Sequence, residues 1–332
     1  MNTELTPNFD PKNIVNSIRK AIDIGTTQST LASQGVDWES VVGVLDEAEH
    51  LIGKEMSVNS HLNSVMFTDE FNKQYEKTLP LISNFYSDLG ANKDLYKAFK
   101  RVNETTLNLQ QKHIVNDSLR SFELSGVALD GAKSEQFKEI QEQLSVLSNQ
   151  FSKNVLQSTN SWKKTVSAEE LKGYGADEFS KVKTGDHYEI NLQVPVYIDL
   201  MTYADSSDLR EEVYKAYISR ASDIGITSKE FDNRPIMDEI LKLRLEMSEL
   251  VGFSNYADYS TQSKMVDSPD AVVDFLSTLI ELSTPQAKAE LSDLERFAGH
   301  ALMPWDLMYY SEKLKQKTFS FKRSDLKPYF PE

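Results

Sequence analysis

The sequence predicts a predominantly α-helical protein with one small strand element. Apolar residues recur at steps of three and four along most of the 332-residue chain, as they do on one face of a helix. The most regular run lies at 133–157 and contains Phe137, Ile140, Leu144, Leu147, Phe151 and Val155. Alternation typical of a strand is found only near Tyr188 to Gln193. The expected architecture is therefore a multi-helix, bundle-like lobe with a single strand or hairpin arm.

Composition limits the classes of partner and the compartment. The net charge of -15 argues against nucleic acid or an anionic membrane as the main partner, because both attract clustered Lys and Arg. The absence of cysteine excludes disulfides and thiolate metal sites, and it suits a reducing compartment. No secretory signal and no apolar run of the ~20 residues needed for a membrane helix is recognisable. We therefore expect a soluble, cytoplasmic protein.

The first part of the chain is expected to be a series of helices. Residues 1–11 should form an extended arm, because Pro7 and Pro11 disfavour helix. Helices are predicted to start near Asn13, Trp38, Asp69, Leu95 and Leu109. Pro80 should kink the third, and Gly126 is a typical C-terminal cap for the fifth.

A change of pattern follows the long helix at 133–157. Ser167 to Glu170 has the form of a capping box, which predicts a short helix ending at Gly173. The glycine-rich, polar stretch 172–186 is expected to be a loop, and Pro195 should end the strand that follows. We place the domain boundary here, with an N-terminal helical domain at 1–186 and a second domain at 187–332.

The segment 201–223 predicts an amphipathic helix preceded by a polar turn at Ala204 to Ser207. Its predicted core face holds Leu209, Val213, Ala216, Tyr217 and Ala221. Its predicted solvent face holds Arg210, Glu211, Glu212, Lys215 and Arg220.

Further helices are predicted towards the end of the sequence. One runs from Pro235 to Val251. Ser268-Pro269 and Thr284-Pro285 each have the cap-then-proline pattern, which predicts two successive helices. Pro304 should open a last helix through Tyr310.

The search for a catalytic metal site finds no histidine pair on one helical turn. The five histidines are His50, His61, His113, His187 and His300, and the closest two are 11 positions apart, so the zinc motif H-E-x-x-H is absent. Glu47 and His50 have the Glu-x-x-His spacing of di-iron bundles, although a solvated helix face with an incidental histidine is the simpler interpretation. His61 fits either a hydrogen-bonding role between helices or contact with a substrate.

Three aromatic residues lie close together near the end of the sequence. Trp305, Tyr309 and Tyr310 could line a peptide channel or pack in a helical core. Motifs of serine hydrolases, phosphate-binding loops and dinucleotide sites are absent. No residue is therefore assigned a catalytic, cofactor-binding or metal-binding role.

Several segments resemble the thimet-type zinc oligopeptidases, and within that family its oligopeptidase A branch. In the family's order these segments are Ser60–Val65, Tyr75–Leu81, Leu119–Gly126, Met201–Asp223, Gly252–Asp258, Pro304–Asp306 and Tyr309–Lys313. The resemblance covers nearly the whole chain. It implies an intact enzyme with two mostly helical lobes facing each other across a deep channel, with zinc on the channel floor.

The resemblance also implies a function that this sequence does not complete. Family members hydrolyse short peptides with a zinc-activated water, and their zinc ligands and general base lie in a later part of the enzyme. We therefore expect an N-terminal portion, truncated before the zinc-binding motif, that binds no zinc and is catalytically inactive alone. Short peptides and a separate C-terminal half are the expected partners.

Two other interpretations stay open. The chain could be a stand-alone helical module that binds peptides or proteins. It could also be an enzyme of another mechanism built from Asp, Glu and Tyr side chains.

Overall fold

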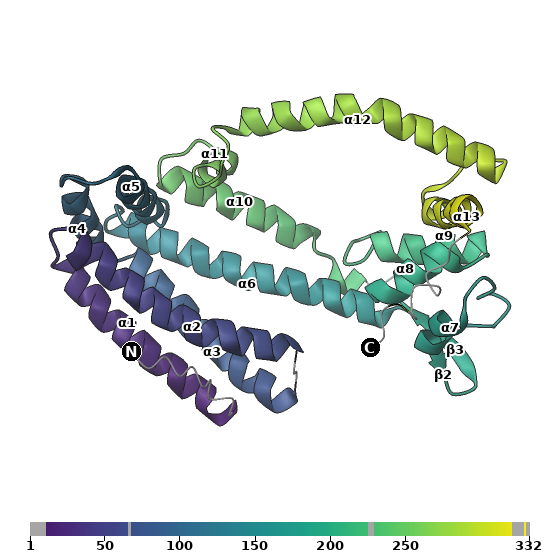
Figure 1. The fold of residues 1–332 in the computed structure, drawn as a ribbon, viewed down its shortest axis with the longest axis horizontal. Coiled ribbons are helices and arrows are strands. Elements are labelled where there is room, and N and C mark those ends of the chain that lie inside the picture. Colours follow the sequence, from purple (N-terminus) through teal and green to yellow (C-terminus); the bar gives the residue numbers. More distant parts are fainter. Residues whose placement is uncertain (1–10, 66–67, 225–228, 321–328, 330–332) are drawn as a thin grey trace. The chain divides into compact units, whose positions relative to one another are not determined.

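The computed structural model describes residues 11–65, 68–224, 229–320 and 329 (Figure 1). The expected extended arm at 1–11 lies outside these residues except for Pro11. Helices make up most of the described chain: α1 (Ile14–Ser33), α2 (Val44–Val65), α3 (Asp69–Gly90), α4 (Lys93–Asn103), α5 (Leu109–Leu124), α6 (Ala132–Ser161), α7 (Ala176–Val182), α8 (Val194–Tyr203), α9 (Ser207–Ile218), α10 (Arg234–Leu250), α11 (Tyr256–Thr261), α12 (Pro269–Ala298) and α13 (Leu307–Phe319). Short helical turns are η1 (Pro11–Asn13), η2 (Glu39–Gly43), η3 (Lys229–Phe231) and η4 (Pro304–Asp306). The strands are β1 (Lys163–Val166), β2 (Lys183–Thr184) and β3 (His187–Asn191). The predicted mostly helical fold is confirmed.

The chain forms two compact units, each made of two segments. Unit 1 contains Met1–Glu139 with Leu245–Pro269, and unit 2 contains Ile140–Arg244 with Asp270–Glu332. The predicted domain boundary divides the sequence once, between residues 186 and 187, whereas each unit combines two segments. That boundary stays a prediction.

Unit 1 is built around α1, which packs against α2 and α3. The approach is close at Gly25, where an added Cβ would lie 2.9 Å from the Phe85 ring and 3.0 Å from Ile52 Cδ1. The predicted starts of α1 and α3 are confirmed, and the helix predicted after Trp38 begins as η2 and continues as α2. Helix α3 continues through Pro80. Side chains satisfy the first free N–H groups of three helices, through Thr68, Asn92 and Asn108.

The predicted cap after α5 is also confirmed. Gly126 has a φ of +77°, a left-handed conformation that favours glycine, and the Val127 N–H donates to the Phe122 carbonyl.

Unit 2 contains the small sheet, whose strand order is β1-β3-β2 with both pairings antiparallel. The predicted strand near Tyr188 is β3, the central one. Its outer partner β1 begins at Lys163, opposite Asn191, and was not predicted because a four-residue strand is too short to show alternation. Behind the sheet lies a core that joins it to α8 and α9.

Residues 167–195 differ from the prediction in three ways. The capping-box contacts form between Ser167 and Glu170, but they close a hydrogen-bonded turn and not a helix. The stretch expected to be a loop contains α7 and β2. Pro195 does not end the strand, since β3 already ends at Asn191; it lies in the first turn of α8, where its missing N–H is not needed.

A single helix, α12, replaces the two helices predicted from the proline pattern. Ser268-Pro269 does mark its start, but Thr284-Pro285 lies inside it. The Thr284 hydroxyl donates to the Ile280 carbonyl at 2.5 Å, as a helical side chain does, rather than capping a new helix. Figure 1 shows α12 as one continuous ribbon. The last predicted helix is also longer than expected, since α13 extends to Phe319.

In the described part of the chain, no helix is long and apolar enough to cross a membrane.

Candidate functional site

A buried polar group in unit 2 is centred on Arg210, in α9. Its side chain is 2% exposed, which corrects the prediction that Arg210 lies on the solvent face. Nη2 lies 2.6 Å from Asp306 Oδ1, and Nη1 donates to the Ala204 carbonyl at 2.5 Å. Nε donates to the Trp305 carbonyl at 3.2 Å. The guanidinium therefore fastens η4 and the start of α13 to the N-terminal end of α9.

Asp306 has donors on both carboxylate oxygens. Besides Arg210, the Ser207 hydroxyl donates to Oδ1 at 3.1 Å and the Met303 N–H to Oδ2 at 3.2 Å. Burial raises the pKa of Asp306, but hydrogen bonds from Arg210, Met303 and Ser207 outweigh it, so the pKa lies below its ordinary value. The ion pair is therefore charged and satisfied at neutral pH.

A second carboxylate extends this cluster along α13. Asp205 Oδ1 accepts from the Tyr309 hydroxyl at 2.8 Å and from Lys313 Nζ at 3.3 Å. Burial together with the hydrogen bond to Asp205 raises the pKa of Tyr309 to about 12. The Arg210 guanidinium lies 4.2 Å from the centre of the Tyr309 ring, a cation–π distance. We call these five residues, Asp205, Arg210, Asp306, Tyr309 and Lys313, the Arg210 cluster.

The three aromatic residues singled out in the sequence separate into different contacts. Trp305 packs against the unit 2 core, with its ring centre 5.9 Å from that of Tyr214. Tyr309 belongs to the Arg210 cluster, whereas Tyr310 bonds His300 Nε2 at 3.0 Å. All three side chains are partly exposed, so each presents a ring edge or hydroxyl at the surface. The three rings thus take part in separate packing and hydrogen-bond contacts and do not line one common pocket among those found in the described residues.

The structure does not bring the histidines together. All five are exposed, and no group of three or more His, Cys, Asp or Glu side chains that could hold a metal occurs among the described residues. His113 contacts Asp117 on its own helix, and His50 and His61 lie on α2. The described residues therefore do not fit a catalytic zinc site.

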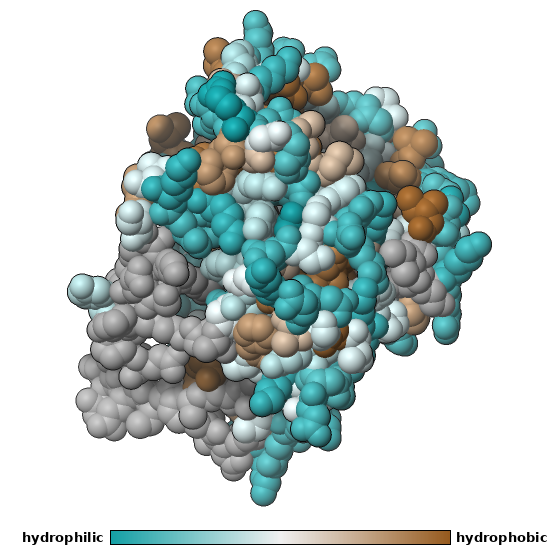
Figure 2. Space-filling model, turned by 90° about the vertical axis from the view of Figure 1, so that its right-hand side faces the viewer, coloured by the Kyte–Doolittle hydropathy of each residue, from teal (hydrophilic) through white to brown (hydrophobic). Residues whose placement is uncertain are grey.

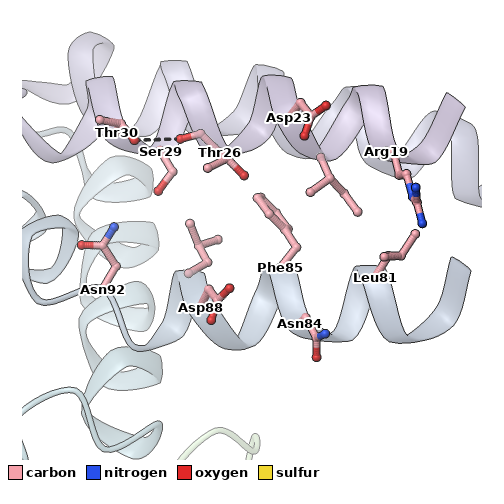
Figure 3. A pocket seen from close by; sticks show the side chains of 12 residues that line it. Arg19, Asp23, Thr26, Ser29, Thr30, Leu81, Asn84, Phe85, Asp88 and Asn92 are labelled. Atoms are coloured by element: carbon pink, nitrogen blue, oxygen red, sulfur yellow. Dashed lines mark hydrogen bonds between the residues drawn. The ribbon is translucent and has the colours of Figure 1, made fainter. Parts of the chain in front are cut away.

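Unit 1 contains a surface groove of about 370 Å³ between α1 and α3 (Figure 3). Arg19 and Asp23 border it from α1, Asn84 and Asp88 border it from α3, and the Phe85 ring points into the space between the helices. A second groove of about 320 Å³ lies between α5 and the segment Val251–Gln262. Sequence reasoning missed both, because their polar linings are ordinary solvent-facing positions on each helix.

The comparisons with known proteins agree with this fold. Residues 17–134 match the family model described as Neurolysin/Thimet oligopeptidase, N-terminal domain, and residues 200–332 match Peptidase family M3. The two segments joined by Arg210 and Asp306 both fall in the second match. The chain belongs to peptidase family M3 and corresponds to the N-terminal part of its members.

The chain is similar to several oligopeptidases over almost its whole length. It is 40% identical to Oligopeptidase A of Salmonella typhimurium and to Oligopeptidase A of Escherichia coli, over 97% of this chain and 50% of each relative. It is 31% identical to Probable cytosolic oligopeptidase A of Arabidopsis thaliana, over 88% of this chain and 44% of that protein. The chain thus spans about half the length of the curated relatives it matches.

Proposed function

We propose that this chain supplies the N-terminal lobe and the opening part of the catalytic lobe of a zinc-dependent oligopeptidase of the oligopeptidase A type. The observation that carries the proposal is the 40% identity over 97% of the chain to proteins named Oligopeptidase A. The proposed substrates are short peptides. The boundary between the two parts is proposed at residues 186 and 187.

The zinc ligands and the general base are proposed to come from residues that correspond to the relatives' other half. Support comes from the sequence, which lacks H-E-x-x-H, and from the described residues, which do not fit a zinc site. The role of this chain is then to bind and orient the peptide. We propose that it does not hydrolyse peptides by itself.

The proposed compartment is the cytoplasm. The absence of cysteine suits a reducing environment, and one relative carries the word cytosolic in its name.

The test is cleavage of a quenched fluorescent oligopeptide by the purified chain, with zinc added and then removed by a chelator. Oligopeptidase A of Escherichia coli in the same assay is the positive control. We expect no turnover above the rate without protein. Zinc-dependent turnover by the chain alone would show that it contains a complete catalytic site. It would contradict the proposal that the zinc ligands and the general base come from the other half.

Peptide binding is measured separately, by fluorescence anisotropy of a labelled, non-cleavable oligopeptide. Binding without turnover supports the proposed role in holding substrate. If neither binding nor turnover occurs, the peptide-binding part of the proposal is wrong for the chain alone.

A further inference from the structure

Helix α12 has an apolar surface that its own unit does not cover. From Val273 to Asp293 every residue except Thr284 is exposed, and Leu294 is its one buried residue. The exposed set includes large apolar side chains: Val273, Phe275, Leu276, Leu279, Ile280 and Leu282. Ile280 is 65% and Leu282 72% exposed, values more typical of charged side chains than of these residues. Figure 2 shows one face of the molecule, on which brown hydrophobic side chains lie exposed among hydrophilic ones.

The order of residues in α12 divides the helix into two faces. At about 100° per residue, Leu276 and Leu279 lie at the centre of an apolar arc that covers roughly half of the circumference. Asp274, Ser277 and Glu281 lie on the opposite side. A polar face beside an apolar one is the pattern of a helix that lies on another protein surface. We call residues Val273, Phe275, Leu276, Leu279, Ile280 and Leu282 the α12 face.

A helix whose apolar face is this exposed requires another surface to pack against. Most of the stability of a helix in a protein comes from packing its apolar face, since isolated helices are marginal in water. Exposed apolar patches of this kind usually mark interaction sites. A stable α12 therefore requires a surface that covers the α12 face.

We propose that the α12 face is the docking surface for the polypeptide that corresponds to the second half of the relatives. This inference rests on the proposed function. Helix α12 lies within the match to Peptidase family M3. The part of the relatives that aligns with this chain is about half of their length. The relatives therefore contain a second half of similar size, and this chain leaves an unpaired helix face in the part that belongs to the same family match.

A second copy of the chain fits the α12 face less well. Each copy carries a net charge of -15, and two such copies repel each other. The proposed occupant thus differs from self-association in a way that can be measured.

The test is co-expression of the tagged chain with the second half of Escherichia coli oligopeptidase A, so that neither piece has to fold alone. Leu276→Asp/Leu279→Asp adds two charges to the α12 face. Ser277→Asp/Thr278→Asp adds the same charges one residue away, on the polar side, and is the matched control. We expect the native chain and the control to retain the second half. The face variant should retain at most about one tenth of that amount. Circular dichroism of each purified chain checks that both variants keep the native fold.

Hydrogen exchange of residues 272–283 gives an independent readout. Exchange should be fast in the chain alone and slow in the complex. The α12 face is not the docking surface if a complex forms without slower exchange at residues 272–283, or if the face variant still forms the complex. Either result leaves the proposed function intact. A complex that protects α12 but does not cleave peptides leaves the face intact and counts against the proposed function.

Other occupants give different results. If the chain self-associates in sedimentation velocity and the face variant is monomeric, the occupant is a second copy. If the chain is monomeric and residues 272–283 exchange slowly without a partner, the chain covers its own helix. Failure to retain the second half, when the first half of the Escherichia coli protein retains it, also overturns the proposal.

Discussion

Arg210 Nη2 and Asp306 Oδ1 lie 2.6 Å apart although 96 residues separate them in sequence. Both side chains are almost completely buried, and Nη1 and Nε of Arg210 donate to the carbonyls of Ala204, Asp205 and Trp305. A buried charge pair of this kind contributes little when compared with an apolar pair, but loss of one partner leaves the other charge buried without compensation.

Asp306→Ala should therefore lower the free energy of unfolding by about 3–5 kcal/mol, because Arg210 keeps its burial and loses its counter-charge. Urea denaturation followed by circular dichroism measures the change. Asp293→Ala is the control, since its pair with Arg296 is exposed and should contribute less than about 1 kcal/mol. Equal effects of the two variants would contradict the role given to burial.

The same pair should make stability sensitive to acid. The folded-state pKa values of Asp306 and Asp205 lie below 3.8, so their contribution is complete above that pH and is lost as pH falls through the lower folded values. Asp306→Asn cannot titrate, and its unfolding free energy should fall less steeply below about pH 4 than that of the native chain. Urea titrations at a series of pH values test this. Parallel curves would show that Asp306 is not responsible.

Gly173→Ala should destabilise unit 2 strongly. Gly173 has a φ of +101°, and an added Cβ would lie 2.0 Å from the Tyr203 carbonyl oxygen, a backbone atom that cannot move without disturbing α8. The matched control is Gly185→Ala, which also has a positive φ, +59°, but has no atom within 4 Å of the added Cβ. Thermal melts should show a much larger decrease for Gly173→Ala than for the control. Similar decreases would mean that φ alone, and not the carbonyl, sets the cost.

Ala221→Gly should stabilise the chain by up to about 1 kcal/mol, because Ala221 has a φ of +51° and glycine removes the strain of a left-handed alanine. Ala221 takes part in hydrogen bonds only through its own backbone, which glycine keeps. Its N–H donates to Ser158 Oγ, and its carbonyl accepts from the Asn233 N–H. Ala216→Gly, in the interior of α9, should have the opposite sign. Chemical denaturation of both variants checks the prediction, which fails if both are destabilised.

Periodicity was sufficient for most of the long helices, but not for the positions that depend on distant partners. The spacing of Leu209, Val213 and Ala216 correctly predicted the buried face of α9. The same pattern placed Arg210 in solvent, because its partner Asp306 lies too far along the chain to enter a local argument. Ala221 was assigned to the core face of that helix; it is buried, but it lies beyond the helix end at Ile218.

The candidate sites were even less visible in the sequence. Most polar side chains that border the grooves of unit 1 are solvent-facing positions on separate segments. The Arg210 cluster joins residues from the two sequence segments of unit 2. A local pattern reports which face of a helix is buried, and it carries no information about which other helix meets that face. The resemblance to known segments supplied the family, and the three-dimensional packing supplied the contacts.

The bond between Arg210 and Asp306 also sets an order of events during synthesis. At about 5–20 residues per second, a ribosome needs roughly 5–20 s to advance from residue 210 to residue 306. Throughout that interval α9 has been made but its guanidinium has no carboxylate to bind, and Trp305 has not yet reached the core. Unit 1 receives its last segment, Leu245–Pro269, before unit 2 receives its own. The nascent chain therefore completes unit 1 first and carries a unit 2 that lacks Trp305 and the Asp306 carboxylate until these residues have been made.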